Sequence, residues 1–327
     1  MFNCFSYKSV KFYTLIMCII FVVASLISCS KENELLKIGA TVWPGYEPLY
    51  LARENGFIEK NQFHMVEYLS ASQVMQSYRN DVIDIAALTM DEVLVLVDEG
   101  FDPVVILVLD SSFGADAIIA KPKYKNIVDL KNKRIGYEGT ALGAYVLSRA
   151  LHKNALKGDD VELVLMNVNE TERELKKGSV EAVVTFEPSR SRLLESGYRE
   201  IFNSKEIPNE IVDVLVVKRE VANKNKKQLK NLVDGWFKSV EYLSYDKKKS
   251  MAIINRRLKL SAESLAKAFD DIVFPSRNEN IVLLGNDDVK GTLIGVTQEI
   301  IKNMKQLKLL DDSVVLDGVF DSKFITE

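Results

Sequence analysis

DAIIAK at Asp116–Lys121 and DVLVVK at Asp213–Lys218 are two six-residue stretches built on one plan. Each begins with an aspartate, continues through four apolar residues and ends on a lysine. This pattern is typical of a strand that runs through a core and emerges on both sides. Both stand where the surrounding pattern changes. We expect hinge strands that cross between two lobes, with the aspartates as structural anchors. The alternative is that two buried strands look alike.

Apolar runs alternate with helical patterns on both sides of these stretches. Leu35–Thr41 and Ile83–Leu88 have strand character, and Glu47–Asn55 and Met90–Glu99 read as helices. The same alternation restarts after residue 121. This order predicts an α/β fold with mostly parallel sheets covered by helices. Long helical patterns from about Lys226 onward predict a helical C-terminal region that returns to the first lobe, and a chain of roughly 300 residues suits two lobes.

The N-terminal segment has the layout of a secretory signal. Lys8 and Lys11 precede an apolar run over Phe12–Ile27, and no acidic residue occurs before Glu32. A basic start, an apolar middle and a small residue at the end are typical of such signals. Because the run approaches the roughly 20 residues that span a bilayer, a retained transmembrane anchor is the alternative.

The end of that run favours a lipoprotein. Leu26-Ile27-Ser28-Cys29 resembles a bacterial lipobox, in which a small residue precedes the cysteine whose thiolate takes the lipid. We expect residues 1–28 to be a lipoprotein signal peptide and residues 29–36 a tether lipidated on Cys29. The protein is then periplasmic or at the cell surface, anchored to a bacterial membrane, with inner and outer membrane both open.

Cysteine count and charge exclude several classes of protein. The only cysteine beyond the predicted signal peptide is Cys29, and the only histidines are His64 and His152. We therefore expect no disulfide and no Cys/His metal cluster. Loss of residues 1–28 removes two lysines and no acidic residue, so the formal charge goes from −3 to −5. A mildly acidic chain argues against a nucleic-acid partner.

Five stretches, in their order and spacing, resemble a known family. They are TVWPGYEPLYLARENGF (Thr41–Phe57), VLDSSFGADAIIAK (Val108–Lys121), RIGYEGTALGAYVLSRAL (Arg134–Leu151), VVTFEPSRSRLLESG (Val183–Gly197) and EIPNEIVDVLVVK (Glu206–Lys218). Together they look like the solute-binding proteins of ABC importers for taurine, alkanesulfonates, nitrate and the thiamine pyrimidine precursor. The likeness covers roughly residues 37–245, and the helical tail matches only loosely.

The resemblance implies a two-lobed periplasmic-binding fold with two crossover strands. A ligand would lie between lobes that close by a hinge motion. Residues 37–117 and 218–327 would form the first lobe and residues 118–217 the second. We expect a monomer without cofactor or metal. Its partners would be a small-molecule ligand, an ABC permease and ATPase, and a membrane through the lipid on Cys29.

Loops that follow strands are the expected binding site, because ligands of open α/β sheets lie beyond the carboxyl ends of strands. In the first lobe Trp43 and Tyr46 can stack on a flat or cationic ligand. Asp110 and Ser111 can bond its head group, and Thr89 opens a helix nearby. The alternatives are that the aromatic residues plug the lobe edge, that Thr89 only caps its helix, and that the polar pair ties the hinge strands together.

In the second lobe, Gly139 and Thr140 lie at a strand-to-helix turn that suits an anion or a polar oxygen. Phe186 can stack on a ligand, and Glu187 can accept from a ligand amine. The alternatives are an ordinary helix cap and an acid favoured by the helix dipole.

These loops are aromatic and acidic, and Arg190, a turn further on, is the nearest basic residue. A bare anion such as nitrate would require cations. An aminopyrimidine therefore fits best, and taurine second, with its sulfonate on the Gly139–Thr140 turn and its amine on Glu187.

Two other functions compete with transport. The same fold can deliver a ligand to a membrane sensor instead of a permease, and the sequence does not separate the two. Some proteins that this sequence resembles make the thiamine pyrimidine instead of binding it. They are marked by a cysteine-rich motif and an active-site histidine. Here no cysteine follows Cys29, and neither His64 nor His152 falls in the expected cleft. No nucleophile–base pair is visible, so we expect a binding protein rather than an enzyme.

Overall fold

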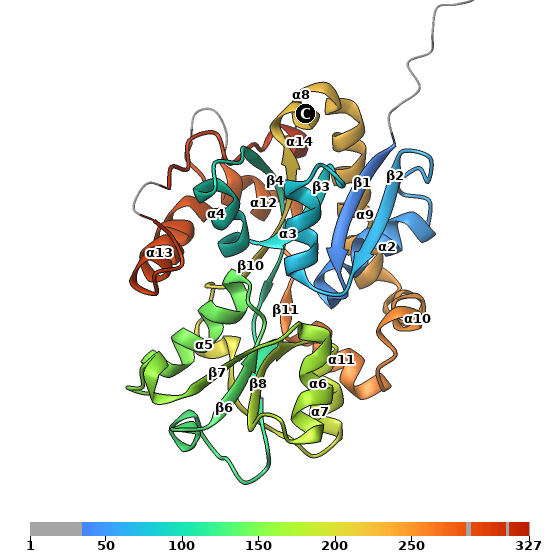
Figure 1. Ribbon diagram of the computed structural model, residues 1–327. Coiled ribbons are helices and arrows are strands. Elements are labelled where there is room, and N and C mark those ends of the chain that lie inside the picture. Colours follow the sequence, from blue (N-terminus) through green and yellow to red (C-terminus); the bar gives the residue numbers. More distant parts are fainter. Residues whose placement is uncertain (1–34, 286–288, 312–313, 327) are drawn as a thin grey trace, which may run out of the picture. The chain divides into compact units, whose positions relative to one another are not determined.

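The computed structural model describes residues 35–285, 289–311 and 314–326 (Figure 1). Residues Leu35–Glu327 form one compact unit. The predicted signal peptide, Cys29 and most of the predicted tether lie outside the described residues. Among the helices of the described part, none has both the length and the apolar character needed to span a bilayer.

Two mixed sheets organise the described chain. The first has the strand order β11-β4-β10-β3-β1-β2. Its strands are β1 (Leu36–Thr41), β2 (Phe63–Tyr68), β3 (Ile85–Thr89), β4 (Pro103–Ser112), β10 (Val212–Lys218) and β11 (Ile272–Val273). The second has the order β7-β6-β8-β5-β9. Its strands are β5 (Asp116–Ala120), β6 (Arg134–Tyr137), β7 (Glu162–Leu165), β8 (Ala182–Phe186) and β9 (Arg199–Asn203).

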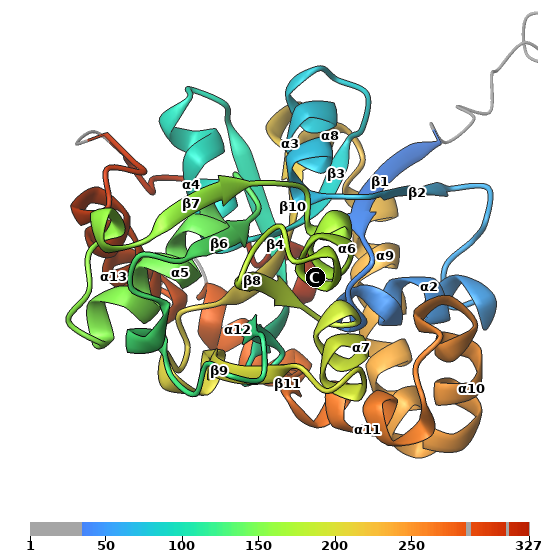
Figure 2. The same ribbon diagram turned by 60° about the horizontal axis from the view of Figure 1, so that its bottom comes forward.

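Helices cover both sheets (Figure 2). Those before β10 are α2 (Glu47–Glu54), α3 (Ala71–Arg79), α4 (Met90–Asp98), α5 (Ala141–Lys153), α6 (Val168–Lys177) and α7 (Ser189–Glu195). Those after it are α8 (Arg219–Lys224), α9 (Lys226–Tyr245), α10 (Lys247–Leu258), α11 (Ala262–Asp270), α12 (Arg277–Leu284), α13 (Leu293–Gln306) and α14 (Lys323–Thr326). Short 3₁₀ turns lie at Pro44–Tyr46, Ile127–Leu130, Gly158–Asp160 and Ser204–Glu206. The predicted α/β class is confirmed.

The expectation of mostly parallel sheets was wrong. Strand β1 pairs parallel with β2 and β3, and β6 pairs parallel with β7 and β8. However, β10 runs antiparallel to β3 and β4, and β5 runs antiparallel to β8 and β9. The reason is the path of the chain, because the strands that follow each crossing enter their sheets in the reverse direction.

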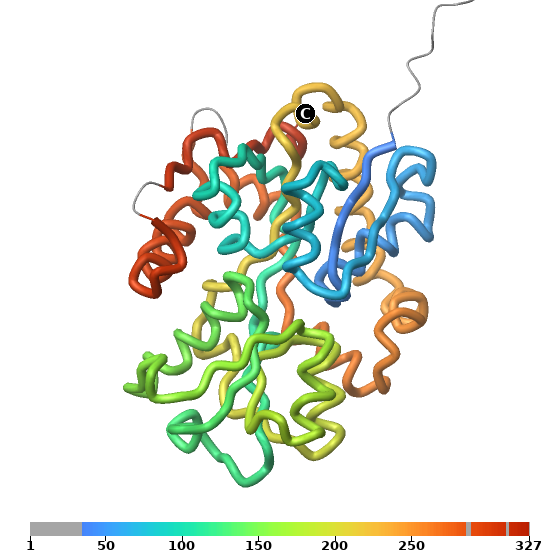
Figure 3. The backbone as a smooth tube through the Cα atoms, viewed as in Figure 1, coloured from blue at the N-terminus to red at the C-terminus, as the bar shows by residue number. Residues whose placement is uncertain are grey.

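The two look-alike stretches lie just after the two crossings. The chain passes from the first sheet to the second between β4 and β5, and it returns between β9 and β10 (Figure 3). DAIIAK forms β5, with all five strand residues buried. DVLVVK lies in β10, in the middle of the other sheet. They are therefore not neighbours in one sheet, and the lobe boundaries expected at residues 117 and 217 remain a prediction.

The C-terminal helices pack back on the first sheet, as expected. Trp236 of α9 is fully buried in the same core as β1, β3 and β4. Asn280 of α12 fixes that helix to β4, because its side-chain oxygen accepts from the Val108 N–H at 2.8 Å and its amide donates to the Val108 carbonyl at 3.1 Å. The helical pattern over residues 287–307 predicts a helix that starts earlier than the one observed, because α13 runs only from Leu293 to Gln306. Before it, α12 ends at Leu284, where Gly285 has a positive φ of 79°.

Candidate functional site

Two adjoining cavities lie between the two sheets, and together we call them the central cleft. In each of them a water-sized sphere can occupy about 20 Å³, and the surrounding space not filled by atoms, open solvent included, is about 320 Å³ for the first and 330 Å³ for the second. They share Ala71, Glu92, Asp116, Leu142 and Phe186, so they form one continuous site. The first sheet and its helices supply the Ala71 and Glu92 side, and the second supplies the Leu142 and Phe186 side.

An aromatic wall is fixed at the first cavity by the loop after β1. The indole N–H of Trp43 donates toward both carboxylate oxygens of Asp110, 3.3 Å from each. The ring meets Phe186 from the other sheet edge to face, with centroids 5.7 Å apart and planes at 89°. Gly45 makes this possible, because a Cβ there would lie 2.1 Å from Asp110 Oδ2 and 2.2 Å from Trp43 Nε1.

Tyr46 completes the wall and is held by the returning strand. Its hydroxyl donates to Asp213 Oδ1, and both side chains are buried. Asp213 of β10 lies opposite Asp110 of β4 in the sheet register. Burial, followed by the charge of Asp213, raises the pKa of Tyr46 well above its usual value. Tyr46 therefore stays a neutral donor that points at the carboxyl pair.

Carboxyl groups crowd the same region. Burial raises the pKa of Asp91 to about 6, of Asp116 to about 7 and of Asp110 to about 8. Burial, reinforced by neighbouring acids, also holds the pKa values of Glu92 and Asp213 well above the ordinary range. No lysine, arginine or histidine lines either cavity in the described chain. The central cleft is therefore a site where buried acids lack cationic partners.

Glu92 has one oxygen in use and one free. The Thr89 backbone N–H donates to Glu92 Oε2 at 3.1 Å, at the start of α4. The other oxygen, Oε1, is buried and has no hydrogen-bond partner among the described residues. Glu92 lines both cavities, so this unpartnered oxygen belongs to the cleft itself. A buried polar atom without a hydrogen-bond partner is costly, and a polar group of a bound ligand would remove that cost.

Glu138 joins the two sides of the cleft. It follows β6 in the second sheet and lines the second cavity. Its Oε1 accepts from both the backbone N–H and the hydroxyl of Ser72 in α3, each at 3.2 Å. Burial raises the pKa of Glu138 above its usual value, and the bonds from Ser72 offset part of that rise. One side chain of the second sheet is thereby tied to a helix of the first.

Five of the residues expected to bind a ligand line the central cleft. Trp43, Tyr46, Thr89 and Phe186 line the first cavity, and Thr140 and Phe186 line the second. Asp110 lies directly behind Trp43 as its hydrogen-bond partner.

The structure places the other three elsewhere. Glu187 lies outside both cavity linings, and its oxygens are taken by Arg190 Nη1 at 2.8 Å and by the hydroxyl and N–H of Ser191 at 2.9 and 3.2 Å. Ser111 lines a separate hollow beside β11 and α12. Gly139 lines neither cavity. The local turn after a strand was visible in the sequence, but which way each side chain points was not.

The sequence reading missed Glu92 and Glu138 as cleft residues, and it took Asp116 and Asp213 for hinge anchors although both line the first cavity. A usable signal existed for the aspartates, since each directly precedes four apolar residues of a buried strand and its stretch has a lysine only at the far end. Glu92 gave none, because it resembles any acid in the first turn of a helix.

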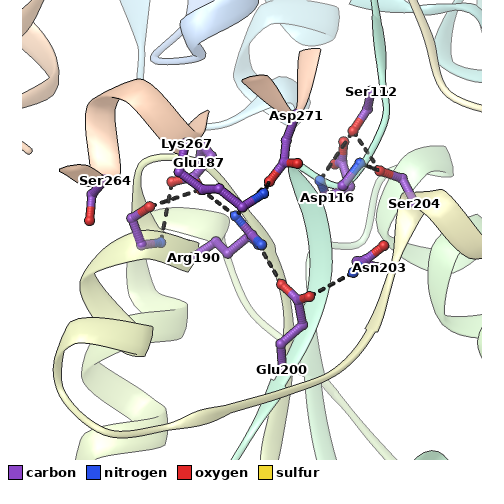
Figure 4. Close-up of polar contacts among 12 residues, drawn as sticks. Ser112, Asp116, Glu187, Arg190, Glu200, Asn203, Ser204, Ser264, Lys267 and Asp271 are labelled. Carbon is purple, nitrogen blue, oxygen red and sulfur yellow. Dashed lines mark hydrogen bonds and ion pairs between the residues drawn. The ribbon is translucent and has the colours of Figure 1, made fainter. Parts of the chain in front are cut away.

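Arg190 organises a second polar cluster beside the cleft (Figure 4). It is 4% exposed and pairs with Glu187 at 2.8 Å and with Glu200 at 2.5 Å. It also lies 3.4 Å from Asp271, at the end of α11, which Lys205 contacts at 2.7 Å and Lys267 contacts as well. This cluster links α7 of the second sheet to the helical region that follows the first.

Residues 30–257 match the model of the NMT1-like family. The chain belongs to this family. It is 26% identical over 163 residues to a "Putative thiamine biosynthesis protein" of Haemophilus influenzae, which covers 49% of this chain and 52% of that protein. The chain thus spans about half the length of this relative.

The fold is that of periplasmic binding proteins, which confirms the predicted architecture. The alkanesulfonate-binding protein SsuA of Xanthomonas axonopodis pv. citri, bound to MOPS, superposes with a TM-score of 0.77 over 90% of this chain and all of that one, at 16% identity. The desulfurization enzyme DSZB superposes with a TM-score of 0.65 over 89% of this chain and 98% of the other, at 15% identity. The fold thus serves both binding and catalysis.

Proposed function

We propose that this NMT1-like chain is the solute-binding lipoprotein of an ABC importer and captures a flat, amine-bearing molecule in the central cleft. The thiamine pyrimidine precursor is the first candidate and a taurine-like molecule the second. The main support for this proposal is the set of residues that line the central cleft. It combines three aromatic rings with buried carboxyl groups and contains no basic side chain in the described chain.

The aromatic rings favour a flat ligand. Trp43 and Tyr46 come from the side of the first sheet, and Phe186 of the second already meets Trp43 edge to face, so a ring bound against them would contact both sides. Such contacts contribute about 0.5–1.5 kcal/mol per aromatic pair beyond the area buried. The same faces attract a cationic group.

The carboxyl groups favour a ligand that brings N–H donors. An aminopyrimidine offers an amine donor and ring-nitrogen acceptors, and a carboxyl that is protonated or ionised can match either. Glu92 Oε1 is the unpartnered oxygen that would accept from such an amine once the bound ligand ionises this carboxyl. A sulfonate or nitrate would instead place negative charge among buried acids, which costs free energy unless cations compensate. Taurine, which carries both an amine and a sulfonate, therefore ranks second.

Binding without turnover is part of the proposal. The lining residues of the described chain include no cysteine or histidine. The family membership and the SsuA-like fold support capture and delivery to a permease. The predicted lipid on Cys29 would keep the receptor at the membrane that holds this permease, on the periplasmic or outer face.

A thermal-unfolding panel on residues 30–327 tests the proposal. The compounds are the aminopyrimidine thiamine precursor, taurine, an alkanesulfonate, nitrate and bicarbonate. A ligand at 100 times its Kd adds about 2.7 kcal/mol to the free energy of unfolding, which raises the midpoint by roughly several degrees. We expect that shift with the aminopyrimidine and none with nitrate.

A matched pair of variants locates the binding. A bound amine would draw Glu92 into its ionised form, and Glu92→Gln cannot ionise and presents an amide N–H instead, so affinity should fall at least tenfold, by about 1.4 kcal/mol. Glu263→Gln makes the same chemical change at an exposed glutamate on α11 and should leave ligand affinity unchanged. Equal affinity in both variants would remove Glu92 from the site.

A further inference from the structure

A basic hollow lies away from the central cleft, between the start of α9 and the C-terminal α14. Its cationic lining residues are Arg219, Lys226, Lys227, Lys230 and Lys323, and Asp321 is its one acidic lining residue. Water-sized spheres can occupy about 480 Å³ of it. The whole chain carries a net charge of −3, so this hollow departs from the average surface.

Most of this positive charge is not neutralised within the protein. Arg219 pairs with Asp102 at 2.7 Å, and Lys230 lies 3.6 Å from Asp234. Lys226, Lys227 and Lys323 are exposed, and their ammonium groups form no ion pair with any described residue. Like charges held together around a hollow repel one another, and an anion placed between them would relieve that repulsion.

The hollow lies beside the point where the chain leaves toward Cys29. Gln228, between Lys227 and Lys230 on α9, donates its side-chain amide to the Gln62 carbonyl at 2.7 Å. The same carbonyl accepts from the N–H of Leu36, the first residue of β1, at 3.0 Å. In Figure 1 α8, α14 and the start of β1 lie at the same end, and the second sheet lies at the other.

The length of the predicted tether limits how far this end can stand from a membrane. Five residues separate Leu35 from Cys29, and the six steps between the two residues span at most roughly 20 Å when extended. A chain anchored through Cys29 therefore keeps the start of β1 near the headgroups. Anionic lipid surfaces attract lysines that come within a Debye length, and each such lysine raises the affinity of the protein for the membrane about fivefold.

We propose that the basic hollow docks on anionic lipid headgroups and orients the receptor with the central cleft away from the membrane. This goes beyond ligand capture and shares with it only the predicted anchor on Cys29. A lipid tail alone leaves a protein free to rotate, whereas a tail and a basic surface together fix one end on the bilayer.

Vesicle sedimentation tests the proposal with residues 30–327, which contain the whole compact unit but no lipid. The vesicles are phosphatidylglycerol with phosphatidylcholine, or phosphatidylcholine alone, at millimolar lipid. We expect binding only to the anionic vesicles, with loss at high salt. The variant K226Q/K227Q/K230Q/K323Q should bind at least tenfold more weakly. The control K123Q/K125Q/K153Q/K157Q removes four exposed lysines of the second-sheet region and should bind like the parent.

The outcomes separate this proposal from its rivals. No binding to anionic vesicles, or equal loss in both quadruple variants, overturns it. Inorganic phosphate that displaces the protein more strongly than chloride at equal ionic strength assigns the hollow to free phosphate and overturns docking on lipid. The assay contains no cleft ligand, so its result does not depend on the proposed transport function, and unchanged thermal unfolding of the variants shows that they fold.

Discussion

The indole nitrogen of Trp43 lies 3.3 Å from each carboxylate oxygen of Asp110, so the ring that faces Phe186 across the central cleft is fixed from behind by a buried acid. The hydrogen bond sets the angle of the aromatic wall. Gly45 leaves room for this hydrogen bond, because a side chain at that position would overlap both Trp43 and Asp110.

Replacing Gly45 by alanine should break this arrangement. The new Cβ would lie within about 2 Å of both partners, and such overpacking costs about 1–3 kcal/mol. We expect a lower unfolding midpoint and weaker ligand binding. Gly295→Ala is the matched control, because a Cβ there meets no atom within 4 Å and alanine favours the α13 helix by up to about 1 kcal/mol. Equal effects of the two changes would contradict this account of Gly45.

The buried acids predict an unusual pH dependence of stability. Burial raises the pKa values of Asp91, Asp116 and Asp110 to about 6, 7 and 8, whereas in the unfolded chain they lie near 4. The folded state therefore binds more protons between about pH 4 and 8, and its stability falls as the pH rises through this range. Unfolding midpoints of the ligand-free protein should be lower at pH 8 than at pH 5.

The variant Asp110→Asn provides the control for this pH dependence. It removes the carboxyl with the highest of these three pKa values and keeps an acceptor for Trp43, so the decline between pH 5 and 8 should become shallower. A midpoint that rises from pH 5 to 8 in the parent protein would show that these acids are ionised in the folded state.

The Arg190 cluster should support stability rather than ligand binding. Arg190→Met leaves Glu187 and Glu200 without their cation, and breaking a buried ion pair from one side costs about 3–5 kcal/mol. Glu187→Gln should cost less, because the Ser191 hydroxyl can still donate to the amide oxygen. Neither change touches the cleft lining, so ligand affinity in the folded fraction should stay within about twofold. A large loss of affinity in Glu187→Gln would return Glu187 to the site.

The bond between Ser72 and Glu138 should affect ligand affinity through closure of the cleft. Ser72→Ala removes the hydroxyl donor but keeps the backbone donor, so the loss should be about 1 kcal/mol, or roughly fivefold in Kd. Ser244→Ala alters an exposed serine whose hydroxyl bonds within α9 and should have no effect. Calorimetric titration compares the two variants. If both bind ligand like the parent, the contact contributes nothing to the closed state.

The sequence predicted the fold better than the binding site. Apolar runs such as Ile83–Leu88 and helix signals such as Thr140 before α5 are local, and the structure confirms both. Sheet direction was missed because it depends on where the chain crosses, which no local pattern records. Glu187 and Glu92 show the same limit at the site. Both are acids at the start of a helix, and only tertiary packing pairs one with Arg190 and leaves an oxygen of the other free.

The most direct test of the central claim is a calorimetric titration of residues 30–327 with the aminopyrimidine precursor of thiamine and, separately, with an alkanesulfonate and nitrate. We predict saturable one-to-one binding of the aminopyrimidine, at least tenfold weaker in Glu92→Gln. Binding of the alkanesulfonate or nitrate without binding of the aminopyrimidine would contradict the account, because the cleft lining would then hold an anion among buried acids.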